Sequence, residues 1–173
     1  MSYQDYHKNT INKFIHVICI PIIMVTSINF FHCIKFKIND PKSGMLGSKI
    51  IHKYKEYGCD YITAMVFPLY YFFFYSNNIG IIMSIFTYVV YKIGGIWRTH
   101  DINWKKHSII LFINAWALQF IGHFIEGNRP ALFSSLQMAV FEAPLYTLQS
   151  LFSFSIDNRL STNIASGESN QPL

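Results

Sequence analysis

Histidines at the ends of two apolar segments are the residues of this chain best suited to carry chemistry. His16 lies at the start of an uncharged stretch, and His123 lies near the end of another, between residues 107 and 125. Ionisable side chains are costly inside a bilayer, so each is a functional candidate by default. His7 lies in the polar segment just before the first stretch. Imidazole suits zinc, copper or non-haem iron, so these residues predict a metal site without choosing the metal.

Polar residues accompany His123 at helical spacing. Gln119, His123 and Glu126 fall at positions i, i+4 and i+7 of an otherwise apolar segment, which places them on one stripe of a helix. A polar stripe within a membrane span must face protein or water. We therefore expect this stripe to face the interior of the protein, with Glu126 either as a metal ligand or as a group that orients His123.

The N-terminal histidines have polar neighbours of their own. Asn9, Asn12 and His16 share one helix face, whereas His7 would point the opposite way on a straight helix. His7 therefore needs a bend near Asn9 to join the same site. The simpler interpretation of each histidine alone is an interfacial side chain that is hydrogen-bonded to backbone or lipid headgroups, and convergence of three histidines with a carboxylate argues against it.

The composition indicates an integral membrane protein. Hydrophobic residues make up 51% of the 173 residues and charged residues only 13%, about half the charged share of an ordinary soluble domain. An apolar soluble bundle would show polar stripes along its helices. The lysines behind the net charge of +5 lie in loops between apolar stretches, so they indicate topology and lipid-headgroup contact and argue against nucleic-acid binding. We expect free thiols, because three cysteines cannot all pair.

The expected architecture is an all-α, polytopic membrane bundle of about five transmembrane or re-entrant helices. One membrane-embedded catalytic domain would cover residues 1–156, and a disordered tail residues 157–173. The expected segments are a span at 14–34, a lysine-rich loop at 35–60, a helical hairpin at 61–97, a span at 107–126, a turn at 127–130 and a last apolar segment to about residue 156. Glu142 and Pro144 interrupt the last segment, so it need not cross the membrane.

The number of crossings decides whether the histidines meet. The uncharged run from Tyr61 to Tyr91 is too long for one straight span, and residues 76–80 break it with serine, asparagine and glycine. Two helices there bring His16 and His123 to the same end of the bundle. A single crossing, which would give four spans, separates them to opposite faces. The positive-inside rule would make the lysine-rich loop cytoplasmic.

Two motifs in these segments resemble those of a known family. Residues 6–16 are similar to Y-H-x-N-x-x-N-x-x-x-H, and Pro21 follows as in the family. Residues 119–132 are similar to Q-F-I-G-H-x-x-E-G-x-x-P-A-L, with Ala143 and Pro144 downstream. Both motifs resemble the 2-hydroxy fatty acid dioxygenase family of endoplasmic reticulum membranes. The chain departs from the family pattern at Ser134, Ser135 and Met138.

The resemblance implies an iron-dependent dioxygenase. Its substrates would be O2 and a long-chain 2-hydroxy fatty acid derived from phytosphingosine, and its products CO2 and the fatty acid one carbon shorter. The resemblance assigns the Fe(II) ligands to His7, His16 and His123. Three open positions on octahedral iron would accept the substrate carboxylate, its 2-hydroxyl and O2. The further candidates, with roles in supporting the ligands or binding substrate, are Glu126, Asn9, Asn12, Gln119 and Arg129.

Two other functions use the same residues. The ligands of a zinc hydrolase acting on a lipid amide or ester could be the same histidines, with a metal-bound water as nucleophile. A non-enzymatic lipid-binding or scaffold protein would use them as interfacial anchors. The remaining histidines, His32, His52, His100 and His107, are expected to be loop or interfacial residues.

Overall fold

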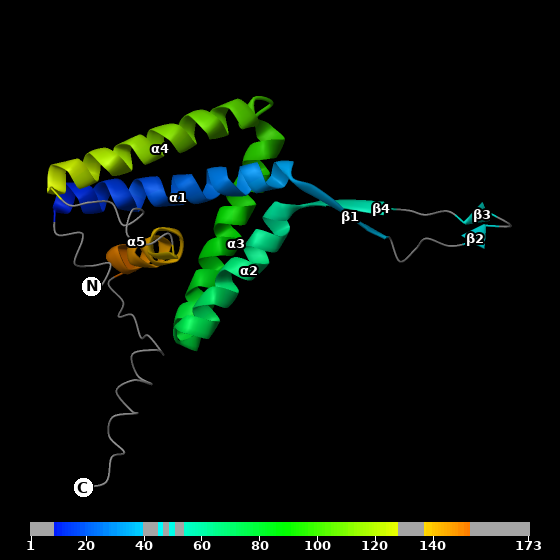
Figure 1. The fold of residues 1–173 in the computed structure, drawn as a ribbon, viewed down its shortest axis with the longest axis horizontal. Helices are drawn as coiled ribbons and strands as arrows, with labels where there is room; N and C mark the ends of the chain where they lie inside the picture. The colour runs from blue at the N-terminus through cyan, green and yellow to red at the C-terminus, as the bar shows by residue number, and fades with distance from the viewer. Residues whose placement is uncertain (1–8, 40–44, 47–48, 51–53, 128–136, 153–173) are drawn as a thin grey trace, which may run out of the picture.

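The computed structural model describes residues 9–39, 45–46, 49–50, 54–127 and 137–152, and its described part is predominantly helical (Figure 1). The helices are α1 (Thr10–Cys33), α2 (Cys59–Phe74), α3 (Asn77–His100), α4 (Trp104–Glu126) and α5 (Ala143–Phe152), and a π-helical turn, η3 (Met138–Glu142), precedes α5. The all-α prediction is therefore confirmed. The predicted tail at residues 157–173 lies outside the described residues.

Three helices are long and apolar enough to cross a membrane: α1, α3 and α4. Helix α2 is apolar but has 16 residues. At 1.5 Å per residue it extends about 24 Å, less than the bilayer's hydrocarbon core of about 30 Å. Helix α5 has only 10 residues. The chain is thus a helical membrane protein in which α2 and α5 are better suited to partial insertion than to a full crossing.

The run from Tyr61 to Tyr91 forms two helices, as predicted. Helix α2 ends at Phe74, and Ser76 begins α3 as its N-cap by accepting a hydrogen bond from the Ile79 backbone N–H. Serine at this position is a common N-cap because its hydroxyl satisfies one of the unpaired N–H groups of the first turn. The run is therefore a helical hairpin and not one continuous helix.

The lysine-rich segment differs from the predicted loop. Strands β1 (Lys35–Asn39) and β4 (Tyr54–Gly58) pair antiparallel, and β2 (Met45–Leu46) pairs with β3 (Lys49–Ile50). The register places Phe36 opposite Tyr57, with stacked rings 5.9 Å apart, and Lys37 opposite Glu56, with 3.2 Å between Nζ and Oε1. Such cross-strand pairs stabilise a ladder. The high lysine content of this segment had led to the prediction of a loop and gave no sign of the paired strands. The ladder extends away from the helices (Figure 1).

Helices α1 and α4 lie side by side and antiparallel over most of their length (Figure 1). The buried residues of each helix at this seam include a series spaced by seven, which is the repeat of left-handed helix packing. These residues are Asn12, Cys19 and Thr26 on α1 and Ser108, Ala115 and Gly122 on α4. Most are small, and small residues let membrane helices approach closely.

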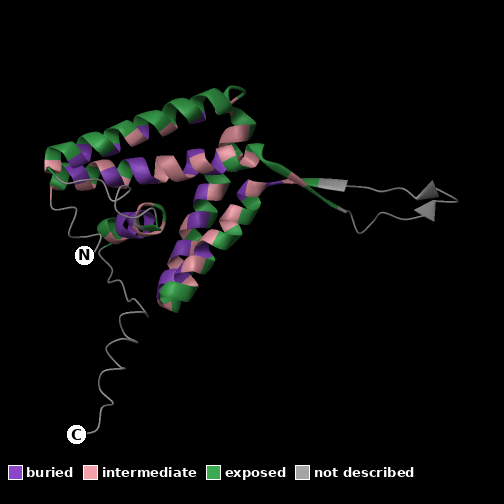
Figure 2. Cartoon of the chain, viewed as in Figure 1, coloured by how far each residue is buried: buried purple, intermediate pink, exposed green. Residues whose placement is uncertain are grey.

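The outward faces of the helices are apolar as well as exposed (Figure 2). On α4 the exposed side chains include Ile109, Ile113, Ile121 and Phe124. A soluble protein would not expose so much contiguous apolar surface. This surface is the expected boundary with lipid. The three cysteines are free, as expected.

Candidate functional site

His16 and His123 meet across the α1–α4 seam. Their ring centres lie 5.0 Å apart, with the ring planes at 83° to each other. Both side chains are almost fully buried, with exposed fractions of 3% and 4%. The prediction that the two histidines share one end of the bundle is thus confirmed. The antiparallel register that pairs them also places Asn12 opposite Glu126 and Asn29 opposite Ser108.

Gly122 permits this close approach. A Cβ atom at Gly122 would lie 2.3 Å from the Asn12 side-chain oxygen and 3.3 Å from Ile15 Cδ1. The first distance is far below van der Waals contact. The glycine that precedes His123 in the motif therefore allows α1 to pack against the α4 backbone, which brings the two imidazoles together.

Glu126 holds the N-terminus of α1. Its Oε1 accepts a hydrogen bond of 2.8 Å from the Asn9 backbone N–H, and its Oε2 accepts one from the Asn12 side-chain amide. Asn9 is also the N-cap of α1, since its side chain accepts from the Ile11 N–H. Asn9 has an extended backbone and α1 begins at Thr10. The helix therefore does not continue through Asn9, which is where the sequence predicted a bend. Carboxylates are favourable at helix N-termini because the helix dipole is positive there.

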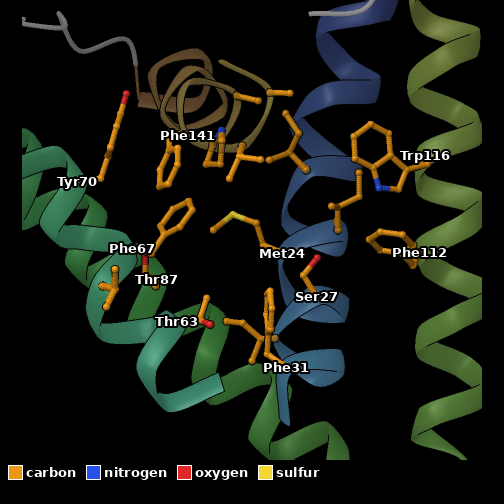
Figure 3. Close-up of a pocket in the computed structure, with 18 of the residues that line it drawn as sticks. Met24, Ser27, Phe31, Thr63, Phe67, Tyr70, Thr87, Phe112, Trp116 and Phe141 are labelled. Atoms are coloured by element: carbon orange, nitrogen blue, oxygen red, sulfur yellow. The ribbon is translucent and has the colours of Figure 1, made fainter. Parts of the chain in front are cut away.

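His16 and His123 both line a cavity of about 840 Å³, part of which is shown in Figure 3. Its walls come from α1 and α4 on one side and from α2 and α3 on the other. Gln119 lines it beside His16 and His123, and most of the remaining lining is apolar. Its volume lies within the usual range of about 300 to 1,000 Å³ for small-molecule sites. An apolar cavity with polar groups at one end suits an amphiphilic ligand.

The π-helical turn η3 closes one side of the cavity. Phe141 stacks on Tyr70 of α2, with ring centres 4.1 Å apart, and its carbonyl accepts a 2.6 Å hydrogen bond from the Tyr71 hydroxyl. Glu142 ends this turn, and burial raises the pKa of its carboxyl. Pro144 lies in the first turn of α5 and also lines the cavity. The last apolar segment therefore forms a wall of the cavity, consistent with its predicted interruption.

The distance between the two imidazole rings is compatible with a shared metal ion. With a metal–nitrogen bond of about 2.1 Å, a ring centre lies about 3.2 Å from the metal. Two imidazoles then have centres about 4.5 Å apart in adjacent octahedral positions and about 5 Å apart in tetrahedral ones. The observed 5.0 Å agrees with either arrangement. Within the described part of the chain no group of three histidine, cysteine, aspartate or glutamate side chains is placed to hold a metal ion.

Two predicted site residues lie outside the described residues. These are His7 and Arg129, and the departures from the family pattern at Ser134 and Ser135 lie there too. Among the predicted residues that are described, three line the cavity: His16, His123 and Gln119. Glu126 is hydrogen-bonded to Asn9 and Asn12 at the start of α1, and we call this group the clasp.

A second polar cluster at the other end of the helices was not predicted. Arg98 of α3 donates to Asp60 Oδ2 of α2 at 3.0 Å and to the Asn29 side-chain oxygen of α1 at 2.8 Å. Asn29 donates to Ser108 Oγ of α4 at 3.0 Å. The Asp60 side chain is only 4% exposed. This four-residue cluster joins α1, α2, α3 and α4. Asn29, a polar residue inside the first apolar stretch, was the sequence signal for it.

Two of the histidines expected to be loop or interfacial residues make specific contacts. His32 Nδ1 donates to Asp60 Oδ2 at 3.0 Å, and His32 Nε2 accepts from Lys35 at 2.8 Å. His32 thus belongs with the second cluster. His107 contacts Asp101 at 2.6 Å on the exposed surface, and His100 is exposed at the end of α3.

Comparison with known proteins agrees with this arrangement. The family model described as "2-hydroxy-palmitic acid dioxygenase Mpo1-like" matches residues 1–155. The chain is also 26% identical over 167 residues to 2-hydroxy-palmitic acid dioxygenase MPO1 of Saccharomyces cerevisiae, a match that covers 94% of this chain and 83% of the yeast protein. No solved structure matches. This chain belongs to the Mpo1-like family.

Proposed function

We propose that the protein is an Fe(II)-dependent dioxygenase that shortens long-chain 2-hydroxy fatty acids by one carbon. The observation that carries the proposal is the buried pair of His16 and His123 at the polar end of an otherwise mainly apolar cavity. A 2-hydroxy acid has the matching polarity, with a carboxylate and a hydroxyl on adjacent carbons and a hydrocarbon chain beyond them. The name of the yeast relative supports the substrate class.

The proposed reaction balances without an external reductant. The acid R–CH(OH)–COOH and O2 give R–COOH, CO2 and H2O. The bond between C1 and C2 breaks, C1 leaves as CO2, and C2 becomes the new carboxyl carbon. C1 loses one electron and C2 loses three, and these four electrons reduce O2 completely. The hydrogen atoms of C2, of the hydroxyl and of the carboxyl end in the new acid and in water.

The chain's own residues would bind and orient the reactants. His16 and His123 fit as two ligands of Fe(II), and we propose His7 as the third. When bound, iron would supply the activation of O2, which protein side chains do not provide. Gln119 lies beside the pair and is placed to hydrogen-bond the substrate's polar end. The apolar walls would exclude water around that end. We propose that this takes place in the endoplasmic reticulum membrane, on acids released from phytosphingosine.

Turnover of 2-hydroxyhexadecanoic acid by detergent-solubilised protein tests the proposal. The expected products are pentadecanoic acid and CO2, with one O2 consumed for each acid, and a chelator should abolish turnover until Fe(II) is restored. Hydrolysis of a lipid amide or ester by protein containing zinc, with no O2 uptake, would favour the hydrolase instead. Folded, metal-free protein that binds lipid without turnover would favour a non-enzymatic role.

A further inference from the structure

The cavity follows one face of α1 for most of that helix. The α1 residues that line it repeat at helical spacing from His16 to the far end: Ile20, Ile23, Met24, Ser27, Ile28 and Phe31. On α4 the lining runs antiparallel from His123 to Phe112. Phe112 contacts Phe30, with ring centres 5.2 Å apart, so both helices reach the same far end. The cavity therefore runs along α1, with α4 on one side and α2, α3 and the π-helical turn on the other, and we call this lengthwise path the channel.

Helix geometry gives the length of this channel. Ser27 lies eleven residues beyond His16 and Phe31 lies fifteen beyond it. At 1.5 Å per residue these positions are about 16 Å and 22 Å from the His16 level. A carbon–carbon bond of about 1.5 Å with a near-tetrahedral angle advances an extended chain by about 1.25 Å per carbon. The two positions thus correspond to about 13 and 18 carbons.

The channel also has a direction. His16, Gln119 and His123 mark one end. Among the described residues that line the cavity there is no lysine or arginine. Near the far end Arg98 is engaged by Asp60 and Asn29, so it offers no competing site for a carboxylate. A carboxylate and hydroxyl at the histidines, with the tail toward Phe31, is the orientation that these groups favour.

We propose that Ser27 and Phe31 of α1 determine the chain length of the acid that this protein accepts. The inference rests on the proposed function and adds the residues that set its substrate range. Ser27 lines the cavity, and Figure 3 shows it on α1 at a level between Met24 and Phe31. A small side chain there leaves room for the tail to pass. A large side chain would end the channel at about 13 carbons.

The test compares Ser27→Phe with Ser27→Ala and with Ile18→Phe. Ile18 is an exposed α1 residue that does not line the cavity, so its variant adds the same ring to the lipid-facing side. Ser27→Phe should lower the ratio of kcat/KM for the 16-carbon acid to that for the 12-carbon acid at least tenfold. The two controls should leave this ratio unchanged within twofold. An unchanged ratio in Ser27→Phe would overturn the proposal and indicate that the tail runs toward α2 instead.

Binding provides a readout that does not depend on turnover. Native mass spectrometry of the solubilised protein with 12-carbon and 16-carbon 2-hydroxy acids should show the same selective loss of the longer acid in Ser27→Phe. If no variant turns over any acid but this selectivity appears, the dioxygenase fails and the channel stands. If turnover is normal and neither readout shifts, the channel fails and the dioxygenase stands.

Thr87 of α3 tests whether the part of the cavity beside α3 holds hydrocarbon. Its buried hydroxyl lines the cavity and has no hydrogen-bond partner among the described residues. Thr87→Val removes that hydroxyl and keeps the shape of the side chain. It should leave binding of the saturated 16-carbon acid undiminished, because such a chain offers the hydroxyl no partner. A fivefold or larger loss would contradict a hydrocarbon tail at this position.

Discussion

Burying two imidazole rings in contact between two apolar helices costs free energy. A functional role for His16 and His123 explains why the protein keeps them there. His16 and His123 occupy the end of a cavity rather than a packed core, so the site can receive a ligand. The polar residues around the two histidines have different roles. Gln119 faces the cavity, whereas Glu126 binds the first turn of α1 and so fixes the depth at which His16 lies.

Glu126→Gln should weaken this clasp. The amide keeps the size of the side chain but loses the charge that strengthens both hydrogen bonds and favours the helix N-terminus. We expect about 1 to 2 kcal/mol of lost stability, measured by thermal unfolding in detergent, together with reduced turnover. Glu56→Gln is the control, because Glu56 belongs to an exposed pair and should cost less than about 0.5 kcal/mol. Equal stability of the two variants would contradict the clasp.

The sequence predicted which residues belong to this site. It predicted the contacts that each of them makes less well. Helical spacing placed Gln119, His123 and Glu126 on one inward stripe, and the structure confirms it. The partner of Glu126 could not be predicted, because it depends on a contact between residues 114 positions apart. Local periodicity carries no information about such a pairing.

At the scale of elements, the α1–α4 seam controls the site. Its small residues are separated by seven positions, a signal that is visible in the sequence once the helices are known to pair. The spans and the break before α3 followed from hydropathy and from the serine and asparagine at the break. The β1–β4 ladder and the π-helical turn could not be predicted in this way. The ladder depends on the pairing of two separate strands, and the turn packs against an aromatic ring of α2 that is distant in the sequence.

Gly122→Ala tests the seam. The added methyl would overlap the Asn12 side chain, so α1 and α4 must separate slightly at the level of the histidines. We expect a loss of about 1 to 3 kcal/mol in stability and at least tenfold lower turnover.

Gly95→Ala is the matched control for this substitution. A Cβ at Gly95 would meet only the end of the Arg98 side chain, at 3.9 Å. Because alanine is the better helix former, this variant should be as stable as the parent or up to about 1 kcal/mol more stable. Normal turnover and stability in Gly122→Ala would show that close packing at the seam is not required.

At the scale of the whole molecule, polar groups at two ends hold an otherwise apolar bundle in one arrangement. The histidine end carries the proposed chemistry, and the Asn29, Asp60, Arg98 and Ser108 cluster joins four helices at the other end. Apolar packing alone specifies helix position weakly in lipid, because lipid tails are as apolar as the side chains. The polar cluster thus fixes how the α2–α3 hairpin sits against the α1–α4 pair, and with it the width of the cavity.

Asp60→Asn should destabilise the whole bundle. It leaves the largely buried Arg98 charge without its counter-ion, which typically costs about 3 kcal/mol or more. Thermal unfolding in detergent measures this cost. The double variant Asp60→Asn with Arg98→Met should lose less stability than the two single variants together, because each removes the same interaction. Strict additivity would show that the two side chains do not interact.

We propose that His16 and His123 hold the iron at which 2-hydroxy acids react. The most direct test measures bound iron and turnover of 2-hydroxyhexadecanoic acid in His16→Ala, His123→Ala and the control His100→Ala, whose histidine is exposed and outside the cavity. We expect the first two variants to remain folded but to lose iron and at least 99% of turnover, while His100→Ala retains both. Retention of iron and turnover in either His16→Ala or His123→Ala would contradict this proposal.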